Sequence, residues 1–429
     1  MNYNALLDHI TSGALDGALE QLYGKSRIPS ERERYANAVR SFGSLYGTDR
    51  ELAIFSTPGR SELSGNHTDH NNGRVIACAV DLDVIAVASP RGDGIIRVKS
   101  EGFDEEIADA SNEPDEREYF TGTAILRGMR AEFEQNCSDS CGFDAYTTSD
   151  VPGGSGLSSS AAFEVLVGSI INEFSGAGAD PAKIARIAQY AENVYFGKPC
   201  GLMDQTACAV GGVVSIDFEI PGNAVIEKMD FDFRGAGYAL CIINTGGNHA
   251  NLTPDYAAIP AEMKQVAAHF GADCLREISM AQLLPEIMVL REKVGDRAIL
   301  RAFHFLRENE RVAAQTAALQ SGNLTAFLEG MLASGRSSFE YLQNVWTTAL
   351  PDEQGVSLAL AAAEEVLAKY NTDGVKAAWR VHGGGFAGTV QTLIPLEAAE
   401  ELIALEDSIF GEGAAKVLTP RAAGAVRVV

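Results

Sequence analysis

Residues 151–172, VPGGSGLSSSAAFEVLVGSIIN, carry the most informative pattern in the chain, a glycine- and serine-rich loop that runs directly into an apolar helix. Glycines let the backbone approach a ligand closely and turn its N–H groups inward, and the positive end of the following helix attracts anions. Such a loop can hold the phosphates of ATP. The candidate contacts in this segment are Gly153, Gly154, Ser155, Gly156, Leu157, Ser158, Ser159 and Ser160.

The serines of this loop add hydroxyl donors, and one of them is a candidate magnesium ligand. The loop differs from the two common nucleotide-binding patterns, because it lacks the lysine of GxxxxGK[ST] and does not follow the GxGxxG spacing of dinucleotide-binding folds. The residues alone leave one alternative open, a plain Gly/Ser linker. A linker does not usually continue into an apolar helix, which favours the phosphate-binding interpretation.

The composition limits the partners of the chain. Its 429 residues include 34 Lys and Arg against 58 Asp and Glu, which gives a net charge of −24, and 46% of them are hydrophobic. This is a globular composition, and at about 150 residues per domain the length predicts two or three domains. Because an acidic protein repels nucleic-acid phosphates and anionic membranes, we expect neither as a partner. A phosphate ligand would have to be bound by a local group of residues, against the overall negative charge of the protein.

The sequence predicts a cytoplasmic protein. The first twenty residues have neither the cationic start nor the apolar core of a secretory leader, and no run of about 18 apolar residues occurs. The seven cysteines are scattered, as expected for reduced thiols. Cys137 and Cys141 form a single CxxxC, which does not complete a structural zinc site.

Strand and helix patterns alternate along the chain. A strand is expected to enter a loop at Pro58-Gly59, and the apolar runs 75–89 and 94–100 are expected to form a pair of strands joined by a turn. Helices are expected over residues 6–22, 32–46, 160–172, 181–195 and most of 260–341. The alternation indicates an α+β chain of two closely packed domains, with a boundary near residue 228.

Two further clusters of polar residues could form a site. Residues 59–75, GRSELSGNHTDHNNGRV, crowd charged and amide side chains into a turn-rich stretch suited to a small polyhydroxylated ligand. His67 and His70 could instead be metal ligands. In PCGLMDQTACAVGG, residues 199–212, the lone carboxylate of Asp204 is either a helix cap or a functional group.

Together these segments resemble the signatures of the GHMP small-molecule kinases, most closely the galactokinase branch. TPGRSELSGNHTDHNNG matches in part, whereas VPGGSGLSSSAA, AENVYFGKPCGLMDQ and HGGGFAG match closely, and the resemblance spans residues 57–388. It implies the two-domain GHMP kinase fold, with a ribosomal protein S5 domain 2-like domain over residues 1–228 and a ferredoxin-like α/β domain over residues 229–429. The active site would lie in the cleft between them.

The resemblance also implies an activity and roles for single residues. The reaction would be ATP-dependent phosphorylation of the anomeric C1 hydroxyl of a monosaccharide, with D-galactose expected. Asp204 would accept the proton of that hydroxyl, Arg60 would neutralise charge beside the γ-phosphate, and Ser160 and Glu192 would hold Mg²⁺. The glycines 383–385 would buttress the phosphate loop. The implied sugar-binding residues are Asn66, His67, Asp69, Gly201 and Tyr256.

The chain departs from the galactokinase pattern near the implied sugar site. Asn66 stands where galactokinases usually carry glutamate, Arg60-Ser61-Glu62 replaces Arg-Val-Asn, and the basic pair expected after Tyr256 is absent. The alternatives are therefore another sugar (galactosamine, N-acetylgalactosamine, arabinose or fucose), a mevalonate-type or homoserine acceptor, or a catalytically silent sugar and ATP sensor. We expect a monomer whose partners are a sugar and ATP.

Overall fold

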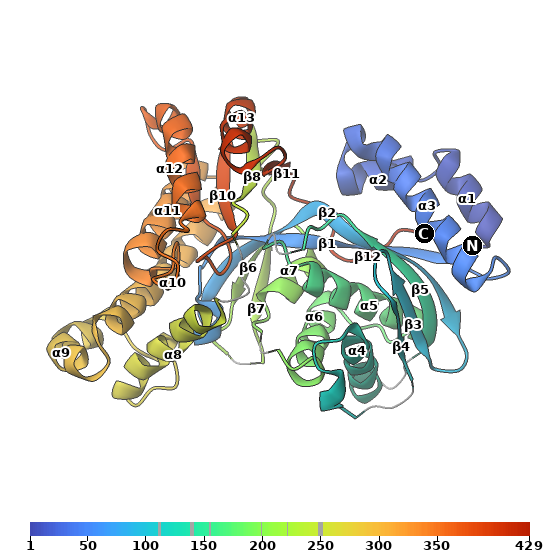
Figure 1. The fold of residues 1–429 in the computed structure, drawn as a ribbon, viewed down its shortest axis with the longest axis horizontal. Coiled ribbons are helices and arrows are strands. Elements are labelled where there is room, and N and C mark those ends of the chain that lie inside the picture. The colour runs from blue at the N-terminus through green and yellow to red at the C-terminus, as the bar shows by residue number, and fades with distance from the viewer. Residues whose placement is uncertain (110–112, 138–140, 154–155, 199, 221, 248–251) are drawn as a thin grey trace.

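The computed structural model of the chain (Figure 1) describes residues 1–109, 113–137, 141–153, 156–198, 200–220, 222–247 and 252–429.

The first part of the chain forms a sheet with helices on both of its faces. Its strands are β1 (Ala53–Ser64), β2 (Arg74–Arg91), β3 (Ile96–Ser100), β4 (Glu105–Ala108), β5 (Gly142–Ser149), β6 (Val213–Asp217) and β7 (Val225–Met229). Its helices are α1 (Tyr3–Thr11), α2 (Asp16–Tyr23), α3 (Ile28–Tyr46), α4 (Gly122–Cys137), α5 (Ser159–Ser175), α6 (Pro181–Tyr190) and α7 (Met203–Val210), and the π-helical turn η4 (Ala191–Tyr195) follows α6.

The second part is mainly helical and contains a smaller sheet. Its helices are α8 (Thr253–His269), α9 (Met280–Lys293), α10 (Asp296–Gln320), α11 (Leu324–Ser337), α12 (Gly355–Leu367) and α13 (Ala399–Phe410), with the π-helical turn η6 (Ser338–Leu342) after α11. Its strands are β8 (Tyr238–Asn244), β9 (Ala378–Val381), β10 (Thr389–Pro395) and β11 (Ala415–Leu418), and β12 (Val426–Arg427) follows them in the chain.

The first sheet is built around two long strands. Its order is β12-β1-β2-β5-β3-β4, and β6 pairs with the first half of β2 and carries β7 on its other edge. All of these pairs are antiparallel except β3 with β5. Alternate residues face opposite sides, so Phe55 packs in the core with α4–α7, whereas Ile54 and Val87 pack against α1–α3. The sheet therefore has one helical layer on each face (Figure 1).

The second sheet has the order β11-β8-β10-β9 and is antiparallel throughout. On β8, Leu240 and Ile242 belong to the same hydrophobic core as the first sheet, and Cys241 packs in a separate cluster with α12 and α13. Strand β12 returns to the first sheet, where Val426 lies opposite Ser56. One continuous core thus joins the two sheets, and the division of the chain near residue 228 stays a prediction.

A buried ionic cluster ties the helices and the end of the chain to β2. The carboxylate of Asp83 accepts hydrogen bonds from Arg34 (2.8 Å), Arg421 (3.0 Å), Tyr23 (2.5 Å) and Ser56. Burial alone would raise the pKa of Asp83, but the two guanidinium groups outweigh it and hold the pKa below its ordinary value. The ionised carboxylate thereby joins α2, α3, β1 and the segment before β12.

Most of the predicted elements are confirmed, and three expectations are wrong. The helix expected over residues 6–22 is divided into α1 and α2 by a turn over residues 12–15, where Gly13 takes a left-handed φ of +84°. The chain does not leave the sheet at Pro58-Gly59, because β1 continues to Ser64 and takes up the proline at an irregularity in its register between Pro58 and Arg60. The runs that form β2 and β3 do not pair with each other, because β5 lies between them and bonds to both. Within the described part of the chain, no helix combines the length and apolar character that crossing a bilayer would require.

Glu406 on α13 gives the fold a pH dependence that can be measured. Its carboxyl group is fully buried, neither of its oxygens has a partner among the described residues, and burial raises its pKa to about 7. The folded state therefore binds this proton more tightly than the unfolded state does, so the contribution of Glu406 to stability is lost as the pH rises through 7.

We predict that Glu406→Gln stabilises the protein at pH 8 by up to about 3 kcal/mol and has little effect at pH 4.5. Urea unfolding followed by circular dichroism at the two pH values would measure the difference. An equal effect of the substitution at both pH values would contradict the prediction.

Candidate active site

Arg60 joins three segments that lie far apart in the sequence. It lies on β1 just after the irregularity at Pro58, and only 6% of it is exposed. Its Nε donates to Asp204 Oδ1 (2.7 Å), its Nη1 donates to the carbonyl of Gly156, and its backbone N–H donates to the carbonyl of Leu157 (3.0 Å). The long strand, the glycine-rich loop and helix α7 therefore meet at this guanidinium.

Asp204 lies in the first turn of α7, where a third of its side chain (33%) stays exposed. Its other oxygen accepts a hydrogen bond from the Ser158 hydroxyl. Burial would raise the pKa of Asp204, but the charge of Arg60 and the hydrogen bonds from Arg60 and Ser158 hold it below the ordinary value. The group is thus a partly exposed, ionised carboxylate paired with an arginine. It is not a helix cap, because no hydrogen bond from the backbone of α7 to its side chain is recorded among the described residues.

The glycine-rich loop lies between β5 and α5. Gly156 (φ +72°) and Ser158 (φ +57°) both adopt the left-handed conformation, and α5 begins at Ser159. Among the described residues no hydrogen bond is recorded from the N–H groups of Gly156, Leu157 or Ser158, so these donors are available to an anion. Gly153 is exposed in the same turn, and the predicted contacts Gly154 and Ser155 lie outside the described residues.

The glycine cluster after β9 packs against this loop. A side chain at Gly156 would bring its Cβ to 3.0 Å from His382 Nδ1 and 3.1 Å from Thr389 Oγ1. His382 is itself fixed by Ser61 through Nε2 (3.0 Å) and by Thr389 through Nδ1 (3.0 Å). His382 and Thr389 thus support the glycine-rich loop from the second sheet.

The residues of the implied sugar site divide into two groups. Asn66 and His67 are directed to the glycine turn, since Asn66 Nδ2 donates to the carbonyl of Gly383 (2.6 Å) and His67 Nε2 to that of Gly384 (2.9 Å). Asn66 is completely buried. The Tyr256 hydroxyl also donates to this turn, at the carbonyl of Gly385 (2.8 Å).

His70 takes part in the same arrangement, and no group of three or more potential metal ligands includes His67 and His70 among the described residues. Asn71 Nδ2 donates to His70 Nδ1 (2.9 Å), and His70 Nε2 meets His67 Nδ1 at 3.3 Å. Because the carbonyl of Gly384 can only accept, His67 carries its proton on Nε2. The hydrogen bonds therefore run in one direction, from Asn71 through His70 and His67 to Gly384. Burial lowers the pKa of both histidines, so both rings are neutral.

Among the described residues, only one carboxylate oxygen of Asp69 has a hydrogen-bond partner. Its Oδ1 accepts the N–H of His70 (2.9 Å), and its Oδ2 lies so close to Gly201 that a side chain at position 201 would overlap it. Burial raises the pKa of Asp69 to about 6, with further contributions from the charges of Asp204 and Glu62. Asp69 and Asp204 therefore belong to one site.

The two predicted metal ligands lie on neighbouring elements. Ser160 is exposed in the first turn of α5, and Glu192 is buried on η4, where its Oε1 pairs with Lys198 Nζ (2.9 Å). Gln205 Nε2 donates both to Glu192 Oε2 (2.8 Å) and to Glu164 Oε2 (3.0 Å). No group of three or more His, Cys, Asp or Glu side chains placed to hold a metal occurs among the described residues.

Glu164 was missed from the sequence, although it follows Ser160 by four positions and so lies on the same face of α5. Burial and the charge of Glu192 raise its pKa to about 8. Two buried carboxyl groups thus share the charge of Lys198. A hydroxyl and carboxylate oxygens are the donors that Mg²⁺ prefers, so the residues present fit this ion.

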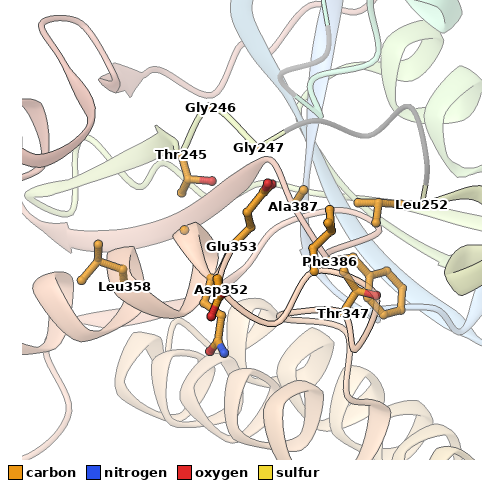
Figure 2. A pocket seen from close by; sticks show the side chains of 13 residues that line it. Thr245, Gly246, Gly247, Leu252, Thr347, Asp352, Glu353, Leu358, Phe386 and Ala387 are labelled. Atoms are coloured by element: carbon orange, nitrogen blue, oxygen red, sulfur yellow. The ribbon is translucent and has the colours of Figure 1, made fainter.

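A separate cavity of about 420 Å³ lies on the second part of the chain (Figure 2). Its walls come from the turn Thr245–Gly247, residues in the range 347–358, and Phe386, with Asp352 and Glu353 directed into it. It contains neither Arg60 nor Asp204. Phe386 links it to the site, because its ring packs edge-on against Tyr256 with 5.3 Å between the centroids.

Comparisons with known proteins agree with this geometry. Residues 120–212 match the model of the GHMP kinases N terminal domain, and residues 40–90 match the galactokinase galactose-binding signature. Among solved structures, the chain is similar to Lactococcus lactis galactokinase complexed with galactose (TM-score 0.73, 23% identity, covering 90% of this chain and 98% of that one). A mevalonate kinase shares the fold at a TM-score of 0.57 and 15% identity, with 85% and 98% covered.

The fold and the loop place the chain among the GHMP kinases, which use ATP as the phosphate donor. Curated relatives narrow this class further. The chain is 32% identical to the galactokinase of Streptomyces coelicolor over 87% of this chain and 92% of the relative, and 31% identical to the human galactokinase over 93% and 98%. The protein belongs to the galactokinase family. The expected family and fold class are confirmed, and the roles of single residues stay predictions.

The packing at Gly156 predicts how a substitution there affects the use of ATP, if the glycine-rich loop holds its phosphates. We predict that Gly156→Ala raises the KM for ATP, because the new Cβ must displace His382 or Thr389 and so move the loop. Gly176, at the other end of α5, has nearly the same conformation (φ +69°) and nothing within 4 Å of the position of a Cβ.

Gly176→Ala is therefore the matched control. Each variant should lose about 1 kcal/mol of stability from its left-handed backbone. Steady-state kinetics with varied ATP and thermal unfolding would separate the two effects. The same KM for ATP in the two variants would contradict the packing argument.

Proposed function

We propose that the protein transfers the γ-phosphoryl group of ATP to the anomeric C1 hydroxyl of a monosaccharide, and that D-galactose is its substrate. The observation that carries this proposal is the Arg60–Asp204 pair, which is bonded directly to the glycine-rich loop. The curated relatives are galactokinases, and the solved relative was crystallised with galactose, which supports this sugar.

The reaction needs alignment and charge neutralisation more than covalent assistance. Asp204 is held by Arg60 and Ser158, so its exposed edge can accept a hydrogen bond from the C1 hydroxyl and orient that oxygen toward the phosphate. A carboxylate whose pKa is lowered is a weak base. We therefore assign it the acceptance of the proton late in the reaction, once phosphorylation has begun to acidify the hydroxyl. Arg60 lies beside this group and offsets the charge of the transferring phosphoryl.

The nucleotide would extend from the loop over the start of α5. The N–H groups of Gly156, Leu157 and Ser158 and the positive end of α5 would hold its phosphates. A cavity of about 300 Å³ adjoins this point, lined by Ser159, Ser160, Phe163 and Phe103 among other residues. Two aromatic rings beside a phosphate-binding loop suit a purine base.

We assign Mg²⁺ to Ser160 and Glu192, because Ser160 lies in the first turn of the helix that follows the loop and Glu192 is bonded to Gln205, the neighbour of Asp204. When bound there, the ion would neutralise charge on the phosphates. Lys198 pairs with Glu192 and carries positive charge at the same point. Gln205 fixes the orientation of the Glu192 carboxylate through the hydrogen bond to Oε2.

The sugar would be met by Asp69 and by the backbone at Gly201, with the ring of Tyr256 beside it. The Oδ2 of Asp69, which has no hydrogen-bond partner in the described part of the chain, can accept hydrogen bonds from sugar hydroxyls, and Gly201 leaves room for that carboxylate. We keep the cytoplasmic location and the monomeric state expected from the sequence as part of the proposal, and size-exclusion chromatography with light scattering would test the latter.

A coupled assay for ADP tests the proposed function. Purified protein with Mg-ATP is expected to release ADP with galactose faster than with galactosamine, N-acetylgalactosamine, arabinose or fucose. Faster ADP release with another sugar would identify that sugar as the substrate and leave the enzyme class unchanged. ATP binding without ADP release on any sugar would show that the protein is a sensor and not an enzyme.

We predict that Asp204→Asn lowers kcat by at least about 100-fold, because the amide cannot take the proton. Asp217→Asn is the control, since Asp217 pairs with Arg74 (2.7 Å) and Arg276 (3.0 Å) and contacts none of the site residues named above. Circular dichroism would establish that both variants fold. Retention of more than a tenth of the wild-type kcat by Asp204→Asn would contradict the assigned role.

The pKa of Asp69 predicts how sugar binding depends on pH. As the pH falls through about 6, the carboxylate takes up a proton and becomes a weaker acceptor, so kcat/KM for the sugar should decline. Asp69→Asn should lower kcat/KM at all pH values and remove this inflection. The test is kcat/KM for the sugar measured from pH 5 to 8 in the wild type and the variant. An unchanged inflection near pH 6 in the variant would show that the inflection belongs to another group.

A further inference from the structure

The turn of residues 383–385 is held at each of its three carbonyl groups. The carbonyl of Gly383 accepts from Asn66 Nδ2 (2.6 Å), that of Gly384 from His67 Nε2 (2.9 Å), and that of Gly385 from the Tyr256 hydroxyl (2.8 Å). These donors come from the segment after β1 and from α8. The turn is therefore fixed from outside its own hairpin.

All donors and acceptors of the Asn66 side chain have partners inside the protein. Its Nδ2 donates to Gly383 and, at 3.4 Å, to Glu62 Oε1. Its Oδ1 accepts from Asn344 Nδ2 (2.8 Å) and from the Ser338 hydroxyl (3.2 Å). An amide side chain has two N–H groups and two acceptor positions, so no polar atom remains for a ligand. The side chain is also 0% exposed.

The two departures from the galactokinase pattern contact each other. Glu62 stands where asparagine is usual and Asn66 where glutamate is usual, and their side chains are hydrogen-bonded. The carboxylate of Glu62 is neutralised by Arg380 Nη2 (2.6 Å), and both groups are buried between β1 and β9. The charge thus lies at position 62, in a contact between the two sheets, and Asn66 meets it only as a neutral donor.

The end of the turn that Asn66 holds is next to His382, which reaches the glycine-rich loop. His382 precedes Gly383 and lies 3.0 Å from the position of a Cβ on Gly156. Its ring is held by Ser61 on β1 and by Thr389 on β10. A displacement of the Gly383 carbonyl therefore acts on His382 and, through it, on the loop that meets the nucleotide.

We propose that Asn66 is a positioning residue that couples the segment after β1 to the phosphate-binding loop through the 383–385 turn, and that it does not bind the sugar. This inference rests on the proposed sugar kinase function for its kinetic test. Loss of Asn66 is expected to weaken ATP binding and to leave the choice between sugars unchanged. A sugar-binding role would produce the opposite pattern.

The test compares Asn66→Ala with Asn72→Ala, the same substitution in the same segment at a residue whose side chain contacts Cys274 and not the turn. For each variant we would measure the KM for ATP, and the ratio of kcat/KM for galactose to that for galactosamine in one preparation. The ratio does not depend on the folded fraction. Asn66→Ala should raise the KM for ATP by about tenfold relative to the control. The ratio should stay within about twofold of wild type.

A changed sugar ratio with an unchanged KM for ATP would overturn the proposal. If Asn66→Ala does not fold, Ser338→Ala removes one hydrogen bond to Asn66 Oδ1 and should shift the KM for ATP in the same direction by a smaller factor. Failure of the proposed function would be seen separately, as the absence of ADP release by the wild-type protein. Calorimetric titration with ATP would then still test the coupling, because Asn66→Ala should raise the Kd without any turnover.

Discussion

The guanidinium of Arg60 is the contact on which the site depends. It is buried on a strand of the central sheet, and it bonds at once to the glycine-rich loop and to the carboxylate of α7. A buried charge is stable only when it is paired and fully hydrogen-bonded, so the loop, the strand and the helix must meet in one arrangement. The same contact lowers the pKa of Asp204 and orients it. The packing of the loop and α7 on β1 and the assembly of the site therefore depend on the same contact.

The sequence predicted the parts of the site that are local. The loop of residues 151–160 was recognisable because glycines, serines and an apolar helix follow one another within one short segment, and Asp204 because it is the lone carboxylate of an otherwise uncharged stretch. Periodicity identified β2 and β3 as strands but could not identify their partner, because β5 returns from beyond α4 to lie between them. The course of β1 through Pro58 was also hidden, since a proline usually ends a strand unless its register is irregular there.

The polar contacts around Asn66 could not have been predicted from any one segment. Asn66 meets Ser338, Asn344 and Gly383, which lie more than 270 positions away in the chain and are brought to it by α11 and the second sheet. The resemblance to known kinases implied a sugar-binding role for position 66. In this chain the packing surrounds Asn66 with protein partners instead. Asp69 shows the converse case, because its place beside Gly201 agrees with the implied site and its raised pKa follows only from burial near Asp204.

The pairing of β12 with β1 has a consequence for synthesis on the ribosome. The strand that carries Arg60 has β2 on one edge. On the other edge it bonds to the glycine-rich loop at Arg60 and, nearer its start, to a short strand that is made after the whole second sheet. Until then that edge offers unpaired backbone groups to other nascent chains. The unpaired part of this edge is shorter at its N-terminal end, because the amino group of Met1 already donates to the carbonyl of Leu52 just before β1. The first part of β1 therefore stays open to such pairing until β12 is made.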